Sequence, residues 1–461
     1  MRIFADSSTS EKLDFNFASE ILGWFVTFDE RSAQAIFEGN GEGLLIQTAD
    51  SSQQVKIAIR GKQRIEPVGA AENPLVPWAD RELIRLQKNL DEMFCRLNLL
   101  FIRKLPWPQG KPFAIAISHD VDLTRKFGPK SAVLSLLSGE YGKFKKSASE
   151  FLSGRSSYWT FPEFLSFYDE KKFKSTFYFL ARAREDRSYR YTIRSQKFRK
   201  LFEKILASGH EIGLHSSKYA FEKPKRIWNE KERLENVLGS EVKGVRQHFL
   251  RLKFPDAWRI FADAGFRYDS SAGFNEKIGF QMGTCFPFNP ERLKNSQQQP
   301  FYEIPFALMD YAWVNYEQDL EAGRAILRQL AGEIQECQGV LHILWHPSNL
   351  AEPRFQPYWQ ELFHWLSKQP FYSDTLGNII DWWDKRRAVQ LTRTGRSGKE
   401  LVFSLSSPAA FSGMVLEMLA CQKIEPVQGV LKVEPRGKKK HWLHLEPLSA
   451  GENPVKIRIE L

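Results

Sequence analysis

Residues 111–122 read KPFAIAISHDVD, an apolar run that ends in a histidine and two acids. Similar runs follow along the chain: STFYFLA at 175–181, HEIGLH at 210–215 and GVLHILWH at 339–346. Runs this rich in apolar residues are typical of strands buried on both faces, and amphipathic helices separate them here. The alternation of buried strands with helices predicts an α/β fold with a parallel sheet or barrel.

The segments on either side of this block have a different texture. Residues 1–65 and the chain after 400 alternate apolar and polar residues in short runs, which predicts half-buried antiparallel strands. Apolar residues at helical spacing predict a helix over residues 80–103. We therefore expect three domains, with an N-terminal α+β domain at 1–108, the α/β block at 109–388 and a small β domain resembling a sandwich at 389–461.

Length and composition exclude several protein classes. A chain of 461 residues exceeds the size of one ordinary core, and 42% apolar residues argue against extensive disorder. The four cysteines (Cys95, Cys285, Cys337 and Cys421) show no CxxC spacing, so we expect free thiols. The net charge of +11 favours anionic partners, but no motif that reads RNA or DNA accompanies it, so we expect no nucleic-acid partner.

The sequence also bears on location. The first residues, MRIFADSSTSEKLDF, lack the basic start and apolar run of a secretory signal. No stretch of about 18 apolar residues occurs anywhere in the chain. We therefore expect a cytoplasmic protein.

The first candidate site follows the first apolar run. Side chains alternate along a strand, so Asp120 and Asp122 share one face and emerge where the strand ends. Two acids at that place are costly unless a cation or a proton transfer requires them, although a loop merely rich in aspartate is the simpler alternative. In barrels, active sites form at the carboxyl ends of the strands, which is where this pair lies.

Histidines end two further runs. His215 closes HEIGLH and His346 closes GVLHILWH, and imidazole is a common ligand of zinc and similar ions. His342 points the same way as His346 but lies about 13 Å deeper, so we expect it to be a hydrogen-bonded interior residue.

A long insertion separates the first two apolar runs. Residues 122–158 far exceed the usual strand-to-helix connection of about 2 to 6 residues. The segment is weakly amphipathic and contains Lys143, Lys145 and Lys146. Packing of a helix against the barrel is the favoured interpretation, and a lid or a helix that touches a membrane is the alternative.

In their order, these motifs resemble the NodB-homology polysaccharide deacetylases, carbohydrate esterase family 4. The resemblance covers about residues 111–385 and implies a distorted parallel (β/α) barrel of about seven strands. It also implies a catalytic base at Asp120, metal ligands at Asp122 and His215, an arginine orienting the base at Arg246 and a general acid at His346. The matching segments are ISHDVD (117–122), GHEIGLHS (209–216), GVRQHFLR (244–251), AGFRYDSSAGF (264–274) and ILWHP (343–347).

The chain departs from the family pattern at one metal ligand. The family has His-Ser/Thr-x-x-His, whereas Tyr219 takes the second histidine position in HSSKY here. A catalytic metal needs about three protein ligands, and Asp122 and His215 supply two. We expect His248 to be the third, with Tyr219, His119 and Cys285 as weaker candidates. Zn²⁺ is the simplest metal for such a set, and iron or cobalt are alternatives.

The resemblance implies a metal-dependent hydrolase that removes an N-acetyl group from an aminosugar in a glycan or its phosphate- or lipid-linked precursor. The basic charge suits a phosphate-bearing substrate and a peripheral membrane contact. Two alternatives remain open at this point. One is an inactive barrel that acts as a carbohydrate-binding or assembly subunit, and the other is a hydrolase of a non-sugar amide.

Overall fold

The structure of the protein is a computed structural model, and it describes residues 44–47, 54–57, 73–96, 100–126, 136–153, 156–181, 191–316, 319–419 and 422–460. The chain divides into two compact units. One contains residues 71–77 and 114–380, and the other contains residues 1–70, 78–113 and 381–461. The predicted strand around residues 24–28 and Cys421 lie outside the described residues.

The unit at 114–380 contains a parallel sheet built from the apolar runs. Its central strand β4 is buried along its whole length, as the sequence predicts. Neighbours along the sheet follow the order β10-β11-β4-β5-β6-β7-β8-β9, and β12 (Tyr372–Ser373) pairs with the start of β4. The strands are β4 (Ala114–Val121), β5 (Ser175–Leu180), β6 (Glu211–Ser216), β7 (Gly244–Gln247), β8 (Tyr268–Asp269), β9 (Tyr302–Glu303), β10 (Leu308–Met309) and β11 (Val340–Leu344).

One segment joins the two edges of this sheet. β9 and β10 are successive parts of residues 302–309, and they pair with β8 and β11 respectively. Between them, Ile304 N–H donates to the Asp269 carbonyl and Ala307 N–H donates to the His342 carbonyl, each at 3.0 Å. Pro305 has no N–H to donate, which interrupts the ladder in the middle of the segment. The sheet thereby becomes the distorted (β/α) barrel that the sequence resemblance predicts.

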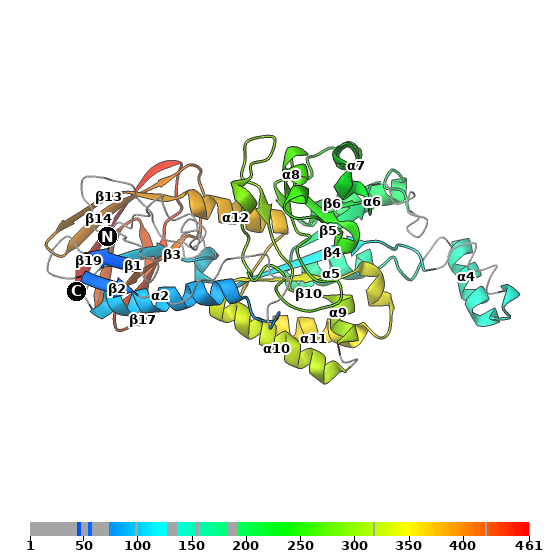
Figure 1. Ribbon diagram of the computed structural model, residues 1–461, viewed down its shortest axis with the longest axis horizontal. Coiled ribbons are helices and arrows are strands. Elements are labelled where there is room, and N and C mark those ends of the chain that lie inside the picture. Colours follow the sequence, from blue (N-terminus) through cyan, green and yellow to red (C-terminus); the bar gives the residue numbers. More distant parts are fainter. Residues whose placement is uncertain are drawn as a thin grey trace. The chain divides into compact units, whose positions relative to one another are not determined.

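Helices lie around the barrel strands (Figure 1). Helix α6 shows why they form: Ser195 caps its first turn, and Phe198, Leu201 and Ile205 make one buried stripe. Helix α10 begins in the same way at Asp319, which accepts from the N–H groups of Glu321 and Ala322. The helices of this unit are α4 (Tyr141–Ser153), α5 (Phe161–Lys171), α6 (Gln196–Ala207), α7 (Pro224–Leu238), α8 (Asp256–Asp263), α9 (Asp310–Asn315), α10 (Leu320–Cys337) and α11 (Gln356–Leu366), and α12 (Leu376–Ala388) leaves it.

The second unit contains two antiparallel four-stranded sheets with a shared apolar core that includes Phe403, Leu416 and Ile457. Their orders are β13-β14-β19-β16 and β17-β18-β15-β3. A separate hairpin, β1 with β2, and helix α2 complete the described part of this unit. The elements are β1 (Leu44–Gln47), β2 (Gln54–Ile57), α2 (Trp78–Arg96), β3 (Phe101–Lys104), β13 (Gln390–Ser397), β14 (Glu400–Ser407), β15 (Val415–Leu419), β16 (Lys423–Gln428), β17 (Val430–Gly437), β18 (Lys440–Leu445) and β19 (Gly451–Glu460).

Strand β3 differs from the sequence-based expectation in two ways. The predicted helix over 80–103 ends at Arg96, and residues 101–104 instead form a strand paired with β15. This pairing places part of the predicted domain 1–108 in the same unit as the predicted domain 389–461. Four residues of mixed polarity fit either a helix end or an edge strand, so only their distant partner strand decides between the two.

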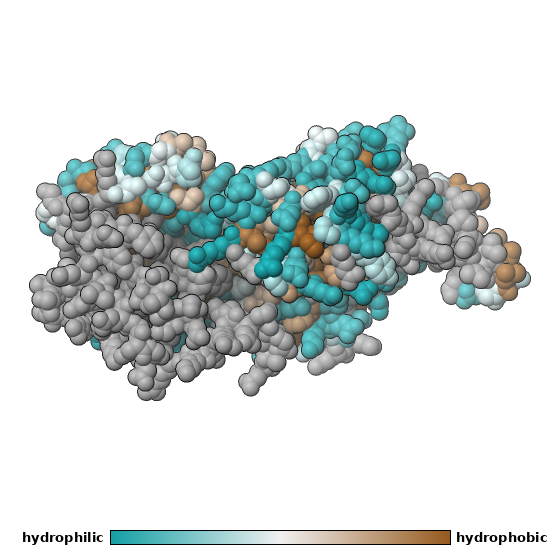
Figure 2. Space-filling view, turned by 45° about the horizontal axis from the view of Figure 1, so that its top comes forward, coloured by the Kyte–Doolittle hydropathy of each residue, from teal (hydrophilic) through white to brown (hydrophobic). Residues whose placement is uncertain are grey.

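Helix α4 in the long insertion also differs from expectation. Packing against the barrel was the favoured interpretation, but Tyr141 is 66% exposed and Leu152 is 83% exposed. Leu136 and Leu137, just before the helix, are 46% and 78% exposed. Figure 2 shows brown apolar residues at its right-hand end, which is where Figure 1 places α4. An amphipathic pattern shows that a helix has an apolar face, but it does not show what covers that face.

Two further expectations, within the described residues, concern the cysteines and the possibility of a membrane-spanning helix. Cys95 and Cys337 are free thiols, as their spacing predicts. None of the described helices combines the length and the apolar content needed to cross a bilayer.

Candidate active site

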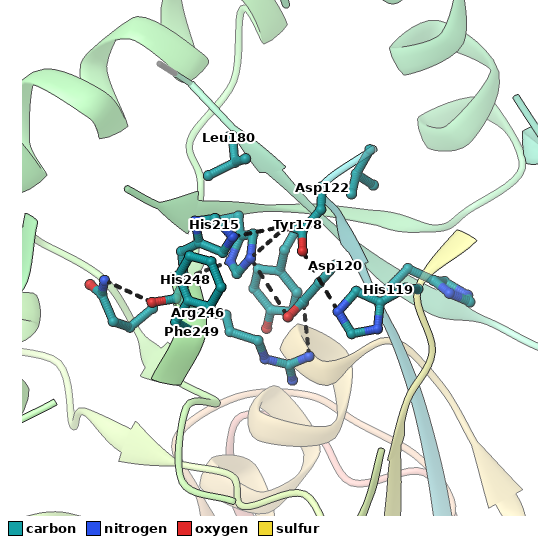
Figure 3. Close-up of polar contacts among 12 residues, drawn as sticks. His119, Asp120, Asp122, Tyr178, Leu180, His215, Arg246, His248 and Phe249 are labelled. Carbon is teal, nitrogen blue, oxygen red and sulfur yellow. Dashed lines mark hydrogen bonds and ion pairs between the residues drawn. The ribbon is translucent and has the colours of Figure 1, made fainter. Parts of the chain in front are cut away.

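The sequence-predicted site residues come together at the carboxyl ends of neighbouring barrel strands (Figure 3). Asp120 lies in β4, and Asp122 follows its last residue. His215 lies near the end of β6, and Arg246 lies in β7. His248 begins the short 3₁₀ helix η3 (His248–Leu250), directly after β7, and His346 follows β11. Parallel strands end at the same rim, which is why residues distant in sequence meet here.

Asp122, His215 and His248 form a potential metal-binding triad. Each offers one donor atom, and the three atoms lie within 4.8 Å of one another. Asp122 Oδ1 lies 3.2 Å from His215 Nε2 and 3.4 Å from His248 Nε2. Donors that bind one zinc ion at about 2 Å stand roughly 3 to 4 Å apart, so this spacing suits the ion.

The protonation of His215 supports the fit. Its Nδ1 lies 3.0 Å from the backbone carbonyl of Arg246, so Nδ1 carries the proton and donates it. An Nε2 without a proton would present a lone pair toward the Asp122 carboxylate, a contact that either a proton on Nε2 or a cation between the two groups relieves. Burial alone would lower the pKa of His215, but the negative charges of Asp120 and Asp122 outweigh burial and raise it. The site therefore attracts positive charge.

The pKa of Asp122 also indicates that this site attracts positive charge. Burial alone would raise the pKa of its carboxyl group, but the hydrogen bonds and charges of His215 and His248 hold that pKa well below its usual range. Asp122 is therefore an anionic donor across the ordinary pH range, as a metal ligand must be.

Arg246 holds Asp120 in place from inside the barrel. The guanidinium is fully buried and donates to Asp120 Oδ1 at 3.1 Å. Its remaining N–H groups donate to Ser118 Oγ, to the backbone carbonyl and Oγ of Ser270, and to His342 Nε2, at 2.8 to 3.1 Å. Burial and the Arg246 charge lower the pKa of His342, so this histidine is neutral and accepts, as an interior residue should.

Aromatic rings fill the barrel below Arg246. The Tyr178 ring centroid lies 4.6 Å from the guanidinium carbon, and Tyr178 Oη accepts from Ser270 Oγ at 2.8 Å. Gly213 in β6 makes room for this ring, because a Cβ there would lie 2.4 Å from the ring carbon Cε1 of Tyr178. The packed interior fixes the guanidinium, and the guanidinium fixes the Asp120 carboxylate.

His346 is paired with an acid that the sequence analysis missed. Asp310, the first residue of α9, lies with its Oδ1 2.9 Å from His346 Nδ1 and accepts from the His346 backbone N–H at 2.7 Å. Burial alone would lower the pKa of His346, but the Asp310 charge outweighs it and raises the pKa to about 9. His346 Nε2 lies 3.8 Å from Asp122 Oδ2, so a protonated imidazole faces the triad. The only signal for Asp310 is its place directly after the apolar strand β10.

The weaker candidates for the third ligand lie elsewhere. Tyr219 is 52% exposed. His119 is buried outside the triad, where its Nε2 lies 2.8 Å from the Tyr168 hydroxyl and its Nδ1 lies 2.8 Å from the Trp345 carbonyl. Cys285 packs against Gly339 at the start of β11, the end opposite His346.

Comparison with known proteins gave matches only among solved structures, since no protein-family model and no curated protein matches the chain. A putative polysaccharide deacetylase from Mycobacterium smegmatis is 18% identical, with a TM-score of 0.43 over 64% of this chain and 98% of that chain. A probable polysaccharide deacetylase from Pseudomonas aeruginosa PAO1 is 14% identical, with a TM-score of 0.42 over 60% and 92%. The Puue allantoinase is 14% identical, with a TM-score of 0.41 over the same shares. Polysaccharide deacetylases are thus among the structures to which this chain is similar, and we argue function from the side chains of this chain alone.

The triad generates a direct prediction about metal affinity. His248→Ala should weaken Zn²⁺ binding by at least roughly tenfold, because two donors remain where about three are needed. Competition with a chromogenic chelator measures the change, and circular dichroism checks that the variant is folded. Tyr219→Phe is the matched control and should bind Zn²⁺ like the unmodified protein. Unchanged Zn²⁺ affinity in His248→Ala would show that another residue is the third ligand.

Proposed function

We propose that this chain is a metal-dependent hydrolase that removes the N-acetyl group from an aminosugar within a glycan or a glycan precursor. The observation that carries the proposal is the convergence of three kinds of group at one rim of the barrel. They are a potential metal triad, a carboxylate held by a buried arginine, and a histidine that an acid keeps protonated. Amide hydrolysis needs an activated carbonyl, a base for water and an acid for the leaving nitrogen.

Asp122, His215 and His248 are the residues that would hold the divalent ion, with Zn²⁺ the simplest choice. Such an ion supplies Lewis-acid polarisation of the acetamide carbonyl and lowers the pKa of a water molecule that it binds. The donor set of two imidazoles and one carboxylate is of the kind that catalytic zinc sites use.

The chain's own groups supply the proton transfers. Asp120 Oδ2 lies 3.7 Å from His215 Nε2, beside the triad, and accepts a proton from the attacking water. Arg246 holds Asp120 through its other oxygen, so Oδ2 remains available. When the C–N bond breaks, His346 donates its Nε2 proton to the departing nitrogen, and the products are acetate and the free amine. Asp310 keeps His346 protonated and oriented for this step.

An inactive barrel that binds carbohydrate or assembles with other proteins is the main alternative. Its support is the missing second histidine at Tyr219. However, His248 Nε2 lies 3.4 Å from Asp122 Oδ1, so three donors are still present. The complete set of base, arginine, acid and third donor supports an enzyme. Purified protein that holds no divalent ion and is not stimulated by adding one would favour the inactive barrel.

A hydrolase of a non-sugar amide would use the same groups. The two activities differ in the substrate, since only an aminosugar deacetylase releases acetate from N-acetylated aminosugars. Acetate release from N-acetylated aminosugar oligomers, compared with ring opening of cyclic amides, separates them. We expect the first activity, and that it requires a divalent ion.

We also propose a peripheral membrane contact through helix α4, which suits a lipid-linked glycan precursor. Leu137, Tyr141 and Leu152 expose 66% to 83% of their surface, and Lys143, Lys145 and Lys146 lie between them in sequence. Exposed apolar residues in and just before an amphipathic helix, together with its lysines, bind anionic bilayers through both features. The same positive charge opposes self-association of two copies through this helix.

The base assignment predicts the effect of one substitution. Asp120→Asn should lower kcat for acetate release by about 10² to 10⁴ and leave the zinc content unchanged, because the amide group cannot accept the proton. Colorimetric or coupled assays of acetate and metal analysis provide the two readouts. The exposed Asp169 in α5 supplies the control, and Asp169→Asn should retain full turnover. Full turnover in Asp120→Asn would remove Asp120 from the mechanism.

The acid assignment predicts a dependence on the leaving group. His346→Ala should lower turnover of an N-acetylated aminosugar by roughly 10² or more, because an amine leaves poorly without a proton. The same variant should lose far less activity on 4-nitrophenyl acetate, whose phenolate leaves unprotonated. Asp120→Asn should lose activity on both substrates. Equal losses on both substrates in His346→Ala would contradict the assignment.

The membrane contact predicts binding to lipid vesicles. The protein should sediment with vesicles that contain phosphatidylglycerol, and Leu137→Glu combined with Leu152→Glu should weaken this binding by about tenfold or more. Leu431→Glu, at a leucine 65% exposed in β17, is the matched control and should not weaken it. Vesicle binding that persists unchanged in the double variant would contradict a role for α4.

A further inference from the structure

Tyr219, which occupies the missing ligand position, belongs to an exposed cluster at the rim of the candidate active site. We call Lys218, Tyr219, Phe249 and Arg251 the rim cluster. Tyr219 is 52% exposed and Phe249 is 43% exposed. Lys218 Nζ lies 5.5 Å from the Tyr219 ring centroid and 5.1 Å from that of Phe249, and Arg251 Cζ lies 5.8 Å from that of Tyr219. Two cations and two aromatic rings thus share one small surface.

The rim cluster adjoins the metal triad directly. The Phe249 ring stacks on the His248 ring, with centroids 4.1 Å apart and an interplanar angle of 24° (Figure 3). A molecule that packs against the exposed Phe249 ring is therefore separated from His248, a potential metal ligand, by the thickness of that ring. A sugar neighbouring the acetylated residue of a glycan would lie at such a distance from the reacting carbonyl.

The backbone that presents Phe249 is strained. Phe249 and Leu250 have φ values of 58° and 50°, so two successive residues with side chains adopt the left-handed region. This conformation costs free energy for any residue with a Cβ and persists where the surroundings hold it. Asn275 Nδ2 donates to the Phe249 carbonyl at 3.1 Å and helps to hold it. Strain that keeps a large aromatic ring exposed beside a candidate site indicates a use in binding.

The two cations of the rim cluster, Lys218 and Arg251, form no ion pair with a carboxylate among the described residues. Lys218 is half-buried and Arg251 is exposed. Arginine and lysine placed beside aromatic rings bind carboxylate or phosphate groups through charge-assisted hydrogen bonds. Aromatic rings next to them offer a flat apolar surface for the C–H face of a sugar ring.

We infer that the rim cluster is a substrate subsite for an anionic sugar residue, which carries a carboxylate or a phosphate and adjoins the aminosugar to be deacetylated. The inference rests on the proposed function and names the class of substrate. Phe249 and Tyr219 pack against the sugar ring, and Lys218 and Arg251 pair with its anionic group. Binding energy gained here, away from the reacting carbonyl, positions the acetyl group beside Asp120 and His346.

Calorimetric binding of matched sugars tests the subsite without requiring turnover. The carboxylate probe is the disaccharide of glucuronic acid and N-acetylglucosamine, and its neutral match is diacetylchitobiose. The phosphate probe is diacetylchitobiose 1-phosphate, and its neutral match is also diacetylchitobiose. At least one anionic probe should bind about tenfold more tightly than its neutral match, as expected for a charge-assisted contact. The probe that shows this preference identifies the anionic group.

The variants assign the preference to the rim cluster. Lys218→Gln combined with Arg251→Gln should remove the preference for the anionic probe and leave the affinity for the neutral match within about twofold. Lys253→Gln, at an exposed lysine of the same loop, is the control for general charge and should retain the preference. Equal affinities for anionic and neutral probes in the unmodified protein, or no binding of any probe, would overturn the inference. A preference lost equally in Lys253→Gln would also overturn it. Anionic binding without acetate release from any aminosugar would instead refute the proposed function and leave the subsite standing.

Discussion

The candidate site depends on one buried cation. The Arg246 guanidinium has no exposed surface, and a charge in such a place is tolerated only when every donor is satisfied. Its partners Ser118, Asp120, Ser270 and His342 come from β4, from β11 and from the end of β8, so the cation ties distant strands together. The same contacts fix the Asp120 carboxylate beside the triad. Stability of the barrel interior and placement of the Asp120 carboxylate therefore have a common physical origin.

The potential metal triad draws one of its three donors from the turn after β7. Tyr219 is exposed outside this triad, and His248 offers its donor atom from the strained turn after β7. That turn also exposes Phe249, which stacks on His248 and extends toward Lys218. One local backbone conformation thus serves both the metal ligand and the proposed subsite.

Two groups beside the triad, Asp120 and His346, have partners of opposite charge. Arg246 donates to Asp120, while Asp310 raises the pKa of His346 to about 9 and keeps it cationic. In the proposed mechanism, these partners suit Asp120 to accept a proton and His346 to donate one. The difference arises because the fold places a cation, Arg246, beside Asp120 and an acid, Asp310, beside His346.

The sequence by itself determined the parallel α/β block, the strand ends that carry Asp120, Asp122, His215 and His346, and the interior position of His342. These follow from local patterns, because an apolar run and the polar residue that ends it are adjacent in the chain. Only the tertiary structure decided that Asp310 pairs with His346, that residues 101–104 form a strand and that Tyr141 and Leu152 of α4 are exposed. Each of these depends on what lies beside the residue in space, and a short segment of sequence does not specify its distant neighbours.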